Sequence, residues 1–420
     1  MDFDLSFGDF DMELEDIEVR KTKKFDRVFR VGFGGSIDQR PALVNGVIFF
    51  GSLDHNIYAV DAGTGKEVWR FKANGPIMES SPVISENVIY IGSFDFNMYA
   101  IDIKTGEEIW KFRSGGEILG CAAIEGDFVY FGSRDGFVYC LRKKDSSLVW
   151  KFRTGDWIAA SPLLHEGRVY IGSFDGNYYC LDKRSGKELW RFKTGGEIYN
   201  VYPGEVYRGM VFIPSFDNFI YAVDAKTGEE KWRFRAGKYG LAAAPYIQDD
   251  IIYQYSREGI LFALDQEGKE LWRFKSGMII AVPNIYNNRI YVGSGDSNLY
   301  CLNMKGEEIW RFKTNGEVYW YPVLWKDRVY FTSWDCHLYC VDVDTRKEIW
   351  RFATSTLSQA SMPPPFESYE IEVKKKVEEK EGGEEKYGLD ISKSEEMGSE
   401  YSFKSEYSIR SEYKQEGEYK

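Results

Sequence analysis

Eight tryptophans, each followed by Arg or Lys and then by Phe, recur along this chain at an almost constant distance. The spacings between them are 41, 40, 40, 42, 40, 38 and 40 residues. A period of about 40 residues is typical of repeat folds, in which each unit buries its apolar face only by stacking on the next unit. The repeat therefore restricts the chain to a stacked or closed repeat architecture. The tryptophans are Trp69, Trp110, Trp150, Trp190, Trp232, Trp272, Trp310 and Trp350.

Each repeat contains four strand signals. The first is an apolar stretch that ends at Pro or at a small residue, and we expect it to be the first strand. In the copy at residues 169–193, the segments VYIGS, NYYCLD and ELWRFK are the expected second, third and fourth strands. Short alternating runs separated by turn residues fold as antiparallel hairpins. The apolar stretches end at Pro41, Pro82, Ala122, Pro162, Pro203, Pro245, Pro283 and Pro322.

Four strands in each of eight repeats predict an all-β fold, an eight-bladed β-propeller of four-stranded antiparallel blades over residues 24–353. Residues 1–23 are expected to form a mobile acidic N-terminal arm, with an added edge strand as the alternative. Residues 354–420 combine a Pro/Glu/Lys-rich linker with a Tyr/Ser/Glu repeat tail, which we expect to be disordered. In this tail Tyr401, Tyr407 and Tyr413 each follow Ser-Glu, and a strand that docks on a partner is the alternative.

Residues 25–31 resemble the fourth strand of a repeat, but the first three strands of that repeat do not precede them. Phe29 precedes Trp69 by 40 residues, and Arg30 corresponds to Arg70. In a closed ring such a strand belongs to the last blade. We therefore expect it to lie beside the blade that contains Trp350, where it either replaces that blade's outer strand or adds to it.

The cysteines and the fourth strand also have predictable environments. Cys140, Cys180, Cys301 and Cys340 occupy a position that holds Ala in the other repeats, so we expect small, buried, free thiols rather than disulfides. Only Cys121 and Cys336 lie outside this pattern. In the fourth strand, Trp190 and Phe192 should face the neighbouring blade while Arg191 and Lys193 face water, which discourages pairing between strand edges.

The net charge of -12 is concentrated at the two ends of the chain. Residues 1–19 carry eight acidic and no basic residues, and residues 353–420 carry sixteen acidic and ten basic residues, so the repeat region is nearly neutral. This distribution predicts no nucleic-acid partner. The N-terminal segment has no basic n-region or apolar h-region, and no apolar run approaches ~18 residues. We therefore expect a cytoplasmic protein that does not insert into membranes.

Between the second and third strands lies a Ser-x-Asp turn, whose Asp can accept hydrogen bonds from the turn's own N–H groups. The residue between Ser and Asp varies around the ring and should lie on one face of it. Aromatic and Arg side chains gathered on one face are typical of binding surfaces. The alternative is that they pack against the loop that joins neighbouring blades. The candidate protein-binding residues are Phe94, Arg134, Phe174, Phe216, Arg257 and Trp334, with Leu53 and Gly295 at the two remaining turns.

The unit resembles the pyrroloquinoline quinone (PQQ) repeat, the propeller repeat of quinoprotein dehydrogenases and of the bacterial outer-membrane assembly lipoprotein. The resemblance covers roughly residues 34–353 and implies an eight-bladed propeller. It says little about activity, because one fold hosts many functions. The matching residues are Gly172-Ser173-x-Asp175-Gly176, Tyr179 to Asp182, Gly186-Lys187 and Trp190.

The resemblance also shows what an enzyme of this kind would need. The dehydrogenases carry adjacent cysteines, carboxylates around calcium and long insertions between blades. Here the closest cysteines, Cys336 and Cys340, are separated by three residues, and the repeat spacing leaves no room for insertions. Three histidines are too few for a histidine-rich metal site. We therefore expect no catalytic residue, no cofactor and no metal.

These observations favour a non-enzymatic scaffold, a monomeric ring that binds protein partners of unknown identity. The alternative is a protein that binds a PQQ-like quinone or another small molecule, including a quinoprotein-type dehydrogenase.

Overall fold

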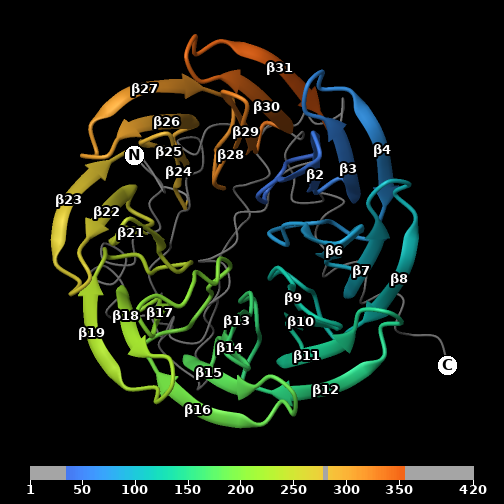
Figure 1. Ribbon diagram of the computed structural model, residues 1–420, viewed down its shortest axis with the longest axis vertical. Helices are drawn as coiled ribbons and strands as arrows, with labels where there is room; N and C mark the ends of the chain where they lie inside the picture. Colours follow the sequence, from blue (N-terminus) through green and yellow to red (C-terminus); the bar gives the residue numbers. More distant parts are fainter. Residues whose placement is uncertain (1–34, 278–281, 355–420) are drawn as a thin grey trace, which may run out of the picture. The chain divides into compact units, whose positions relative to one another are not determined.

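The computed structural model describes residues 35–277 and 282–354. In these ranges the chain forms 31 β-strands in eight antiparallel sheets, which follow one another around a centre (Figure 1). Each sheet is one blade, and its strands pair in chain order. The predicted eight-bladed, all-β propeller is confirmed. We number the blades 1 to 8 along the chain.

The strands of the first four blades have the following bounds. Blade 1 contains β1 (Ala42–Val44), β2 (Val47–Gly51), β3 (Asn56–Asp61) and β4 (Glu67–Lys72). Blade 2 contains β5 (Val83–Ser85), β6 (Val88–Gly92), β7 (Asn97–Asp102) and β8 (Glu108–Arg113). Blade 3 contains β9 (Ala123–Glu125), β10 (Phe128–Gly132), β11 (Phe137–Arg142) and β12 (Leu148–Arg153). Blade 4 contains β13 (Leu163–His165), β14 (Arg168–Gly172), β15 (Asn177–Asp182) and β16 (Glu188–Lys193).

The last four blades continue the pattern, with one strand fewer in blade 5. Blade 5 contains β17 (Met210–Pro214), β18 (Phe219–Asp224) and β19 (Glu230–Arg235). Blade 6 contains β20 (Tyr246–Gln248), β21 (Ile251–Tyr255), β22 (Ile260–Leu264) and β23 (Glu270–Lys275). Blade 7 contains β24 (Asn284–Tyr286), β25 (Arg289–Ser294), β26 (Asn298–Asn303) and β27 (Glu308–Lys313). Blade 8 contains β28 (Val323–Trp325), β29 (Arg328–Ser333), β30 (His337–Asp342) and β31 (Glu348–Ala353).

The first strand of a blade begins where the sequence suggested that it would end. In blade 4, β13 starts at Leu163, directly after Pro162. In this blade the backbone before the proline bonds to a neighbouring blade, since the Ser161 N–H donates to the carbonyl of Asn200 in blade 5 at 3.1 Å. Proline has no N–H and cannot continue a sheet ladder. The predicted position of the first strand is therefore wrong, and we call the segment before it the inner segment of the blade.

Blade 5 departs further from the expected four strands. Its sheet has three strands, and the residues that correspond to a first strand form only an isolated bridge between Tyr207 and Met210. The spacing of 42 residues in this repeat accommodates the longer inner segment. The prediction of four strands in every blade is thus wrong for this blade.

Each repeat tryptophan holds its blade against the next one. Trp150 belongs to blade 3, and its indole Nε1 donates to the carbonyl of Lys183 in blade 4 at 3.0 Å. It also covers Gly186, where an added Cβ would lie 2.6 Å from the indole ring. Gly186 has a φ of 68°, so it both allows the turn and leaves room for the ring. The fourth strand therefore packs through its aromatic face, as predicted, and Arg191 and Lys193 on the other face are exposed.

The same type of contact closes the ring. Trp350 of blade 8 donates from Nε1 to the carbonyl of Ala62 in blade 1 at 3.3 Å and covers Gly65. Figure 1 shows β31 beside the strands of blade 1. β31 pairs with β30, so residues 348–353 themselves form the outer strand of blade 8, which residues 25–31 are not needed to complete. Whether they add to it stays a prediction, because they lie outside the described residues.

In blades 2, 3, 4, 5, 7 and 8 the aspartate of the Ser-x-Asp turn ties the turn to the preceding blade. In blade 3 the Asp135 carboxylate accepts from the Phe137 N–H at 2.9 Å and from the Tyr139 hydroxyl at 2.6 Å. It also accepts from the N–H of Gly115 at 2.7 Å, in the loop that joins blade 2 to blade 3. We call such a connection an interblade loop. The aspartate therefore fixes the turn and the blade interface together, which explains its recurrence.

The cysteine prediction is also confirmed. All six cysteines are free, and the four at the Ala/Cys position are fully buried. Burial raises the pKa of the Cys140 and Cys180 thiols to about 12, so both stay protonated at neutral pH. Cys336 is buried as well, whereas Cys121 is only partly buried and belongs to the inner segment of blade 3.

Candidate functional site

The predicted binding residues lie together on one face of the ring. The N–H of Arg134 donates to the carbonyl of Glu117 at 2.9 Å, in the interblade loop beside it. Phe174 makes the corresponding bond to Trp157 at 3.0 Å. Phe94, Phe216 and Trp334 repeat it at 2.9 to 3.0 Å, while Arg257 bonds its loop through its guanidinium. We call these six residues, Phe94, Arg134, Phe174, Phe216, Arg257 and Trp334, the rim.

The rim side chains rest on the interblade loops and are partly or fully buried. Arg134 forms an ion pair with Glu117 at 3.2 Å and stacks on the ring of Trp157, 4.3 Å from its centroid. Trp334 contacts Tyr319 edge-to-face with a centroid distance of 4.9 Å. The rim side chains therefore pack against the interblade loops, which was the alternative to an open binding surface. This packing does not show whether the rim also binds a protein, so protein binding stays a prediction.

Two rim phenylalanines meet a tyrosine from the inner segment of blade 5. The ring of Tyr199 lies 5.9 Å from that of Phe174 and 6.1 Å from that of Phe216. Aromatic pairs at such distances are mutually attractive. Tyr199 is buried, and through these two ring contacts it links the inner segment of blade 5 to the rim.

A hydrogen bond between distant blades crosses the ring centre. The hydroxyl of Tyr199 in blade 5 donates to the Glu79 carboxyl in the inner segment of blade 2. Figure 1 shows blades 2 and 5 on opposite sides of the centre. Both side chains are buried, and burial raises the pKa of Glu79 to about 8. Glu79 is therefore mostly protonated at neutral pH.

A second buried carboxyl lies next to Glu79. Asp38 of blade 1 accepts a hydrogen bond from Trp320 Nε1 of blade 8 at 2.9 Å, and its backbone carbonyl accepts from the Glu79 N–H at 2.7 Å. Burial raises the pKa of Asp38 to about 6. The charge of Asp38 makes Glu79 harder to ionise, and the two carboxyls together carry about one negative charge at neutral pH.

The backbone at Glu79 is unusual. Its φ is 63°, and the Ser80 N–H donates to the carbonyl of Met78 at 2.7 Å, two residues back. This pattern is a γ-turn with positive φ, a rare and strained conformation for a residue with a side chain. Blade 2 has one residue more between Ile77 and its first strand than blade 3 has between Ile118 and its first strand. The extra residue bulges at Glu79, where the carboxyl meets Tyr199.

Sequence reasoning singled out neither Glu79 nor Tyr199. The available signal was the spacing, because the intervals of 41 and 42 residues are those that contain Glu79 and Tyr199. All other intervals are 40 or 38 residues. The two lengthened repeats are thus the ones whose side chains meet at the ring centre.

A second contact between distant blades lies further along the inner segments, toward the opposite face. The rings of Tyr202 in blade 5 and Tyr321 in blade 8 meet edge-to-face with a centroid distance of 5.7 Å. The exposed guanidinium of Arg40 stacks on Tyr321 at 4.4 Å and donates to its hydroxyl. Burial raises the pKa of the Cys121 thiol, whose Sγ lies 4.0 Å from the Glu79 carbonyl oxygen. Inner-segment side chains of distant blades therefore meet at two levels of the ring centre.

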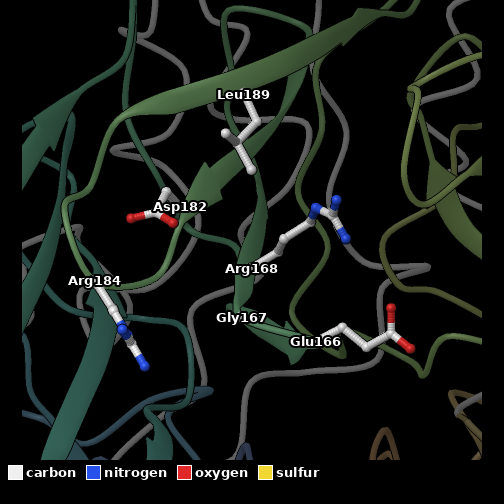
Figure 2. Close-up of a pocket in the computed structure, with 6 residues that line it drawn as sticks. All are labelled: Glu166, Gly167, Arg168, Asp182, Arg184 and Leu189. Atoms are coloured by element: carbon white, nitrogen blue, oxygen red, sulfur yellow. The ribbon is translucent and has the colours of Figure 1, made fainter.

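One surface pocket lies away from these residues, in blade 4 (Figure 2). It has a volume of about 340 Å³ and lies between the β13–β14 hairpin and the turn after β15. Figure 2 shows Asp182 and Arg184 on one side and the head groups of Glu166 and Arg168 on the other. The polar groups do not converge on one point, so the pocket offers no defined binding chemistry.

The described ranges contain neither a group of metal ligands nor a membrane-spanning helix. No group of three His, Cys, Asp or Glu side chains there could hold a metal ion. His337 instead hydrogen-bonds to Asp335 through Nδ1, and this contact raises the pKa of the histidine. Within residues 35–277 and 282–354, no helix is long and apolar enough to cross a bilayer.

Comparisons with known proteins agree with this architecture. A family model described as outer membrane protein assembly factor BamB matches residues 18–151, 99–203, 134–278, 216–303 and 257–369. None of the curated protein sequences matches the chain.

Two solved structures show the same fold at low sequence identity. The crystal structure of BamB from Moraxella catarrhalis is 20% identical, with a TM-score of 0.61, and the match covers 73% of this chain and 96% of that one. The computationally designed Ika8 protein is 17% identical, with a TM-score of 0.63, and the match covers 72% and 94% of the two chains.

Proposed function

Because the chain belongs to the family described as outer membrane protein assembly factor BamB, we propose that it is a non-enzymatic scaffold that binds partner proteins. The observation that carries the proposal is the rim, where aromatic and Arg side chains from several blades share one face. Such side chains are the commonest anchors of protein interfaces. The partner, the cellular compartment and the monomeric state stay predictions.

The residues at the ring centre are poorly suited to the alternative, a bound quinone. Pyrroloquinoline quinone is a tricarboxylate, and the buried carboxyls of Asp38 and Glu79 would lie close to its charges. The contact between Tyr199 and Glu79 also occupies the space between opposite blades. These contacts favour protein binding at the rim over a small ligand at the centre.

Photo-crosslinking from the rim tests this function. We expect a benzoylphenylalanine in place of Phe94, which is partly exposed, to capture a partner in cells. The matched control places the same group at Val68 on the outer strand β4, where 54% of the residue is exposed. Stronger capture from Phe94 is expected, and equal capture from both positions contradicts the proposal.

The captured partner then allows a binding measurement. Phe94→Ala should weaken binding about tenfold, or ~1.4 kcal/mol, the effect of removing a typical interface anchor. The melting temperature should stay close to that of the unchanged protein. Lost stability with unchanged affinity would show that Phe94 serves packing alone.

A further inference from the structure

We propose that the outer edge of blade 3 binds an extended segment of a partner protein in which acidic residues alternate with aliphatic ones. The segment would pair with β12 (Leu148–Arg153) as an additional strand of that blade. Because β12 contains no rim residue, this surface goes beyond the scaffold function proposed for the rim and can be tested separately.

The backbone of β12 has an edge to which another strand can pair. In the described ranges β12 is the end strand of its sheet, where it pairs with β11. The Thr154 N–H donates to the carbonyl of Gly136 at 2.9 Å, and such bonds recur at every second residue of an antiparallel pair. The N–H and carbonyl groups of Lys151 and Arg153 therefore point away from β11. Edges of this kind bind extended peptides through main-chain hydrogen bonds.

Blade 3 lacks the acidic residue that the other blades have at this edge. In those seven blades the fourth strand begins with Glu, which forms an ion pair with the basic residue three positions later. In blade 2, for example, Glu108 pairs with Lys111 at 3.1 Å. Blade 3 has Leu148 at the corresponding position but keeps the basic residue, Lys151.

The basic residues of β12 are therefore left without a carboxylate. Lys151 and Arg153 are exposed, and within residues 35–277 and 282–354 neither forms an ion pair. Their charged groups lie 4.5 and 5.7 Å from the ring centroid of Phe137. Asp145, the acidic residue nearest to Leu148 in the sequence, accepts from the N–H of Ser147 at 3.0 Å and from its hydroxyl at 2.6 Å. The edge thus carries two cations that an incoming strand can neutralise.

Two adjacent aliphatic side chains are exposed next to these cations. Leu148 and Val149 are 48% and 38% exposed. Among the described residues no other fourth strand exposes two large hydrophobic side chains in succession. Covering them with a partner removes apolar surface from water, which is favourable.

The charges of β12 determine which strand fits. A second copy of β12 would bring the cations Lys151 and Arg153 close to like charges, which opposes pairing. A strand with Asp or Glu beside them instead gains pairs of opposite charge across the two strands. Aliphatic residues between the acids would cover Leu148 and Val149. The edge therefore favours an acidic and aliphatic partner strand over another copy of this chain.

Fluorescence anisotropy with a labelled peptide tests the proposal on the full chain. The peptide has six residues, the length of β12, and alternates Val with Glu. Because the chain carries a net charge of -12, a general attraction for an acidic peptide is not expected. We expect saturable binding with a dissociation constant of about 100 μM or below.

Two control peptides separate strand pairing from attraction between charges. One has Lys in place of Glu, and the other has methylated backbone amides that cannot donate to a strand edge. Both should bind much more weakly than the acidic peptide. No binding of the acidic peptide, or equal binding of either control, overturns the proposal.

Blade 2 supplies the matched substitution. Leu148→Glu gives β12 the Glu that β8 has, which can pair with Lys151 and repel the peptide. Binding should weaken about tenfold or more, while the melting temperature should stay close to that of the unchanged protein. Leu189→Ala is the control, because Leu189 is 51% exposed on the outer strand of blade 4 and should not affect binding. Unchanged binding by Leu148→Glu contradicts the proposal.

The reciprocal substitution keeps the test valid if Leu148→Glu does not fold. Glu108→Leu removes the ion pair with Lys111 and should give blade 2 a binding edge of its own. The amount of peptide bound at saturation should then double. Unchanged saturation would mean that the missing acid does not create the site.

Two further measurements distinguish this edge from other occupants and from the rim. In analytical ultracentrifugation, a dimer of the chain that Leu148→Glu dissociates would replace the acidic partner with a second copy and overturn the proposal. Phe94→Ala should bind the peptide as the unchanged protein does. Loss of peptide binding in Phe94→Ala would place the peptide at the rim and overturn the assignment to blade 3, whereas failed capture from Phe94 with intact peptide binding overturns only the function of the rim.

Discussion

At the scale of single residues, two buried carboxyls make the stability of the ring depend on pH. Burial raises the pKa of Glu79 from 4.5 to about 8 and that of Asp38 from 3.8 to about 6. Between these limits the folded protein holds protons that the unfolded chain releases. The contribution of these two carboxyls to the free energy of unfolding is therefore largest below about pH 4 and is lost as the pH rises to about 8.

Glu79→Gln should remove most of this dependence. The amide can still accept from Tyr199 but does not ionise, so the free energy of unfolding at pH 8 should rise by about 2–4 kcal/mol. Below pH 4.5 the difference should nearly vanish, because Glu79 is then protonated in both states. Urea unfolding across this pH range measures the effect. A parallel offset at every pH would mean that Glu79 does not titrate as proposed.

At the scale of single elements, the hairpin between β30 and β31 carries an unfavourable residue. Six blades have Gly with positive φ at this turn, whereas blade 8 has Arg346 with a φ of 63°. The tryptophan that should cover the turn is Trp310, and among the repeat tryptophans of the described residues it is the one whose buried indole Nε1 lacks a hydrogen-bond partner. A Cβ at this position cannot share the space that the indole occupies at Gly186. Blade 3 has Ser146 with a φ of 56° at the same turn, and Trp110 still donates to the carbonyl of Lys143 there at 2.7 Å.

Arg346→Gly should therefore stabilise the protein. We expect a gain of about 1 kcal/mol from relief of the positive φ and from a closer fit of Trp310. Arg346→Ala is the control, because it removes the charge but keeps the Cβ. Denaturant unfolding followed by tryptophan fluorescence measures both. An equal gain from Arg346→Ala would assign the effect to charge rather than to backbone conformation.

Recurring features of the strands and turns could be predicted from the sequence, whereas contacts between distant blades could not. The Trp motif, the Ser-x-Asp turns and the Ala/Cys position were predictable because each recurs in a fixed physical role, as seen at Trp150, Asp135 and Cys140. The inner segments were not, since their partners lie in other blades and leave no period in the sequence. For the same reason the rim positions were predictable, but their packing on the loops and the contact between Glu79 and Tyr199 were not.

At the scale of the whole molecule, the interface between blades 8 and 1 uses the same contacts as the interior interfaces. Trp350 donates to Ala62 and covers Gly65, as Trp150 donates to Lys183 and covers Gly186. In addition, the Tyr58 hydroxyl donates to the carbonyl of Thr354 at 2.7 Å.

Trp350→Phe and Trp150→Phe should therefore cost similar amounts of stability. Each substitution removes an indole hydrogen bond and part of a buried ring, which should lower the free energy of unfolding by about 1–3 kcal/mol. We expect the two losses to agree within ~0.5 kcal/mol. Denaturant unfolding gives the comparison, and the hydrodynamic radius reports whether the ring stays closed. A much larger loss for Trp350→Phe would mean that closure depends on one weak interface.

Every blade in the described ranges is made from one uninterrupted piece of sequence, including the last, in which β28 to β31 follow in order. Within the described ranges no sheet combines strands from the beginning and the end of the chain. A cut in any interblade loop, with the original ends joined, leaves every strand pairing intact. Such a circular permutant needs the same blades in the same cyclic order, so the fold is specified by that order rather than by the position of the termini.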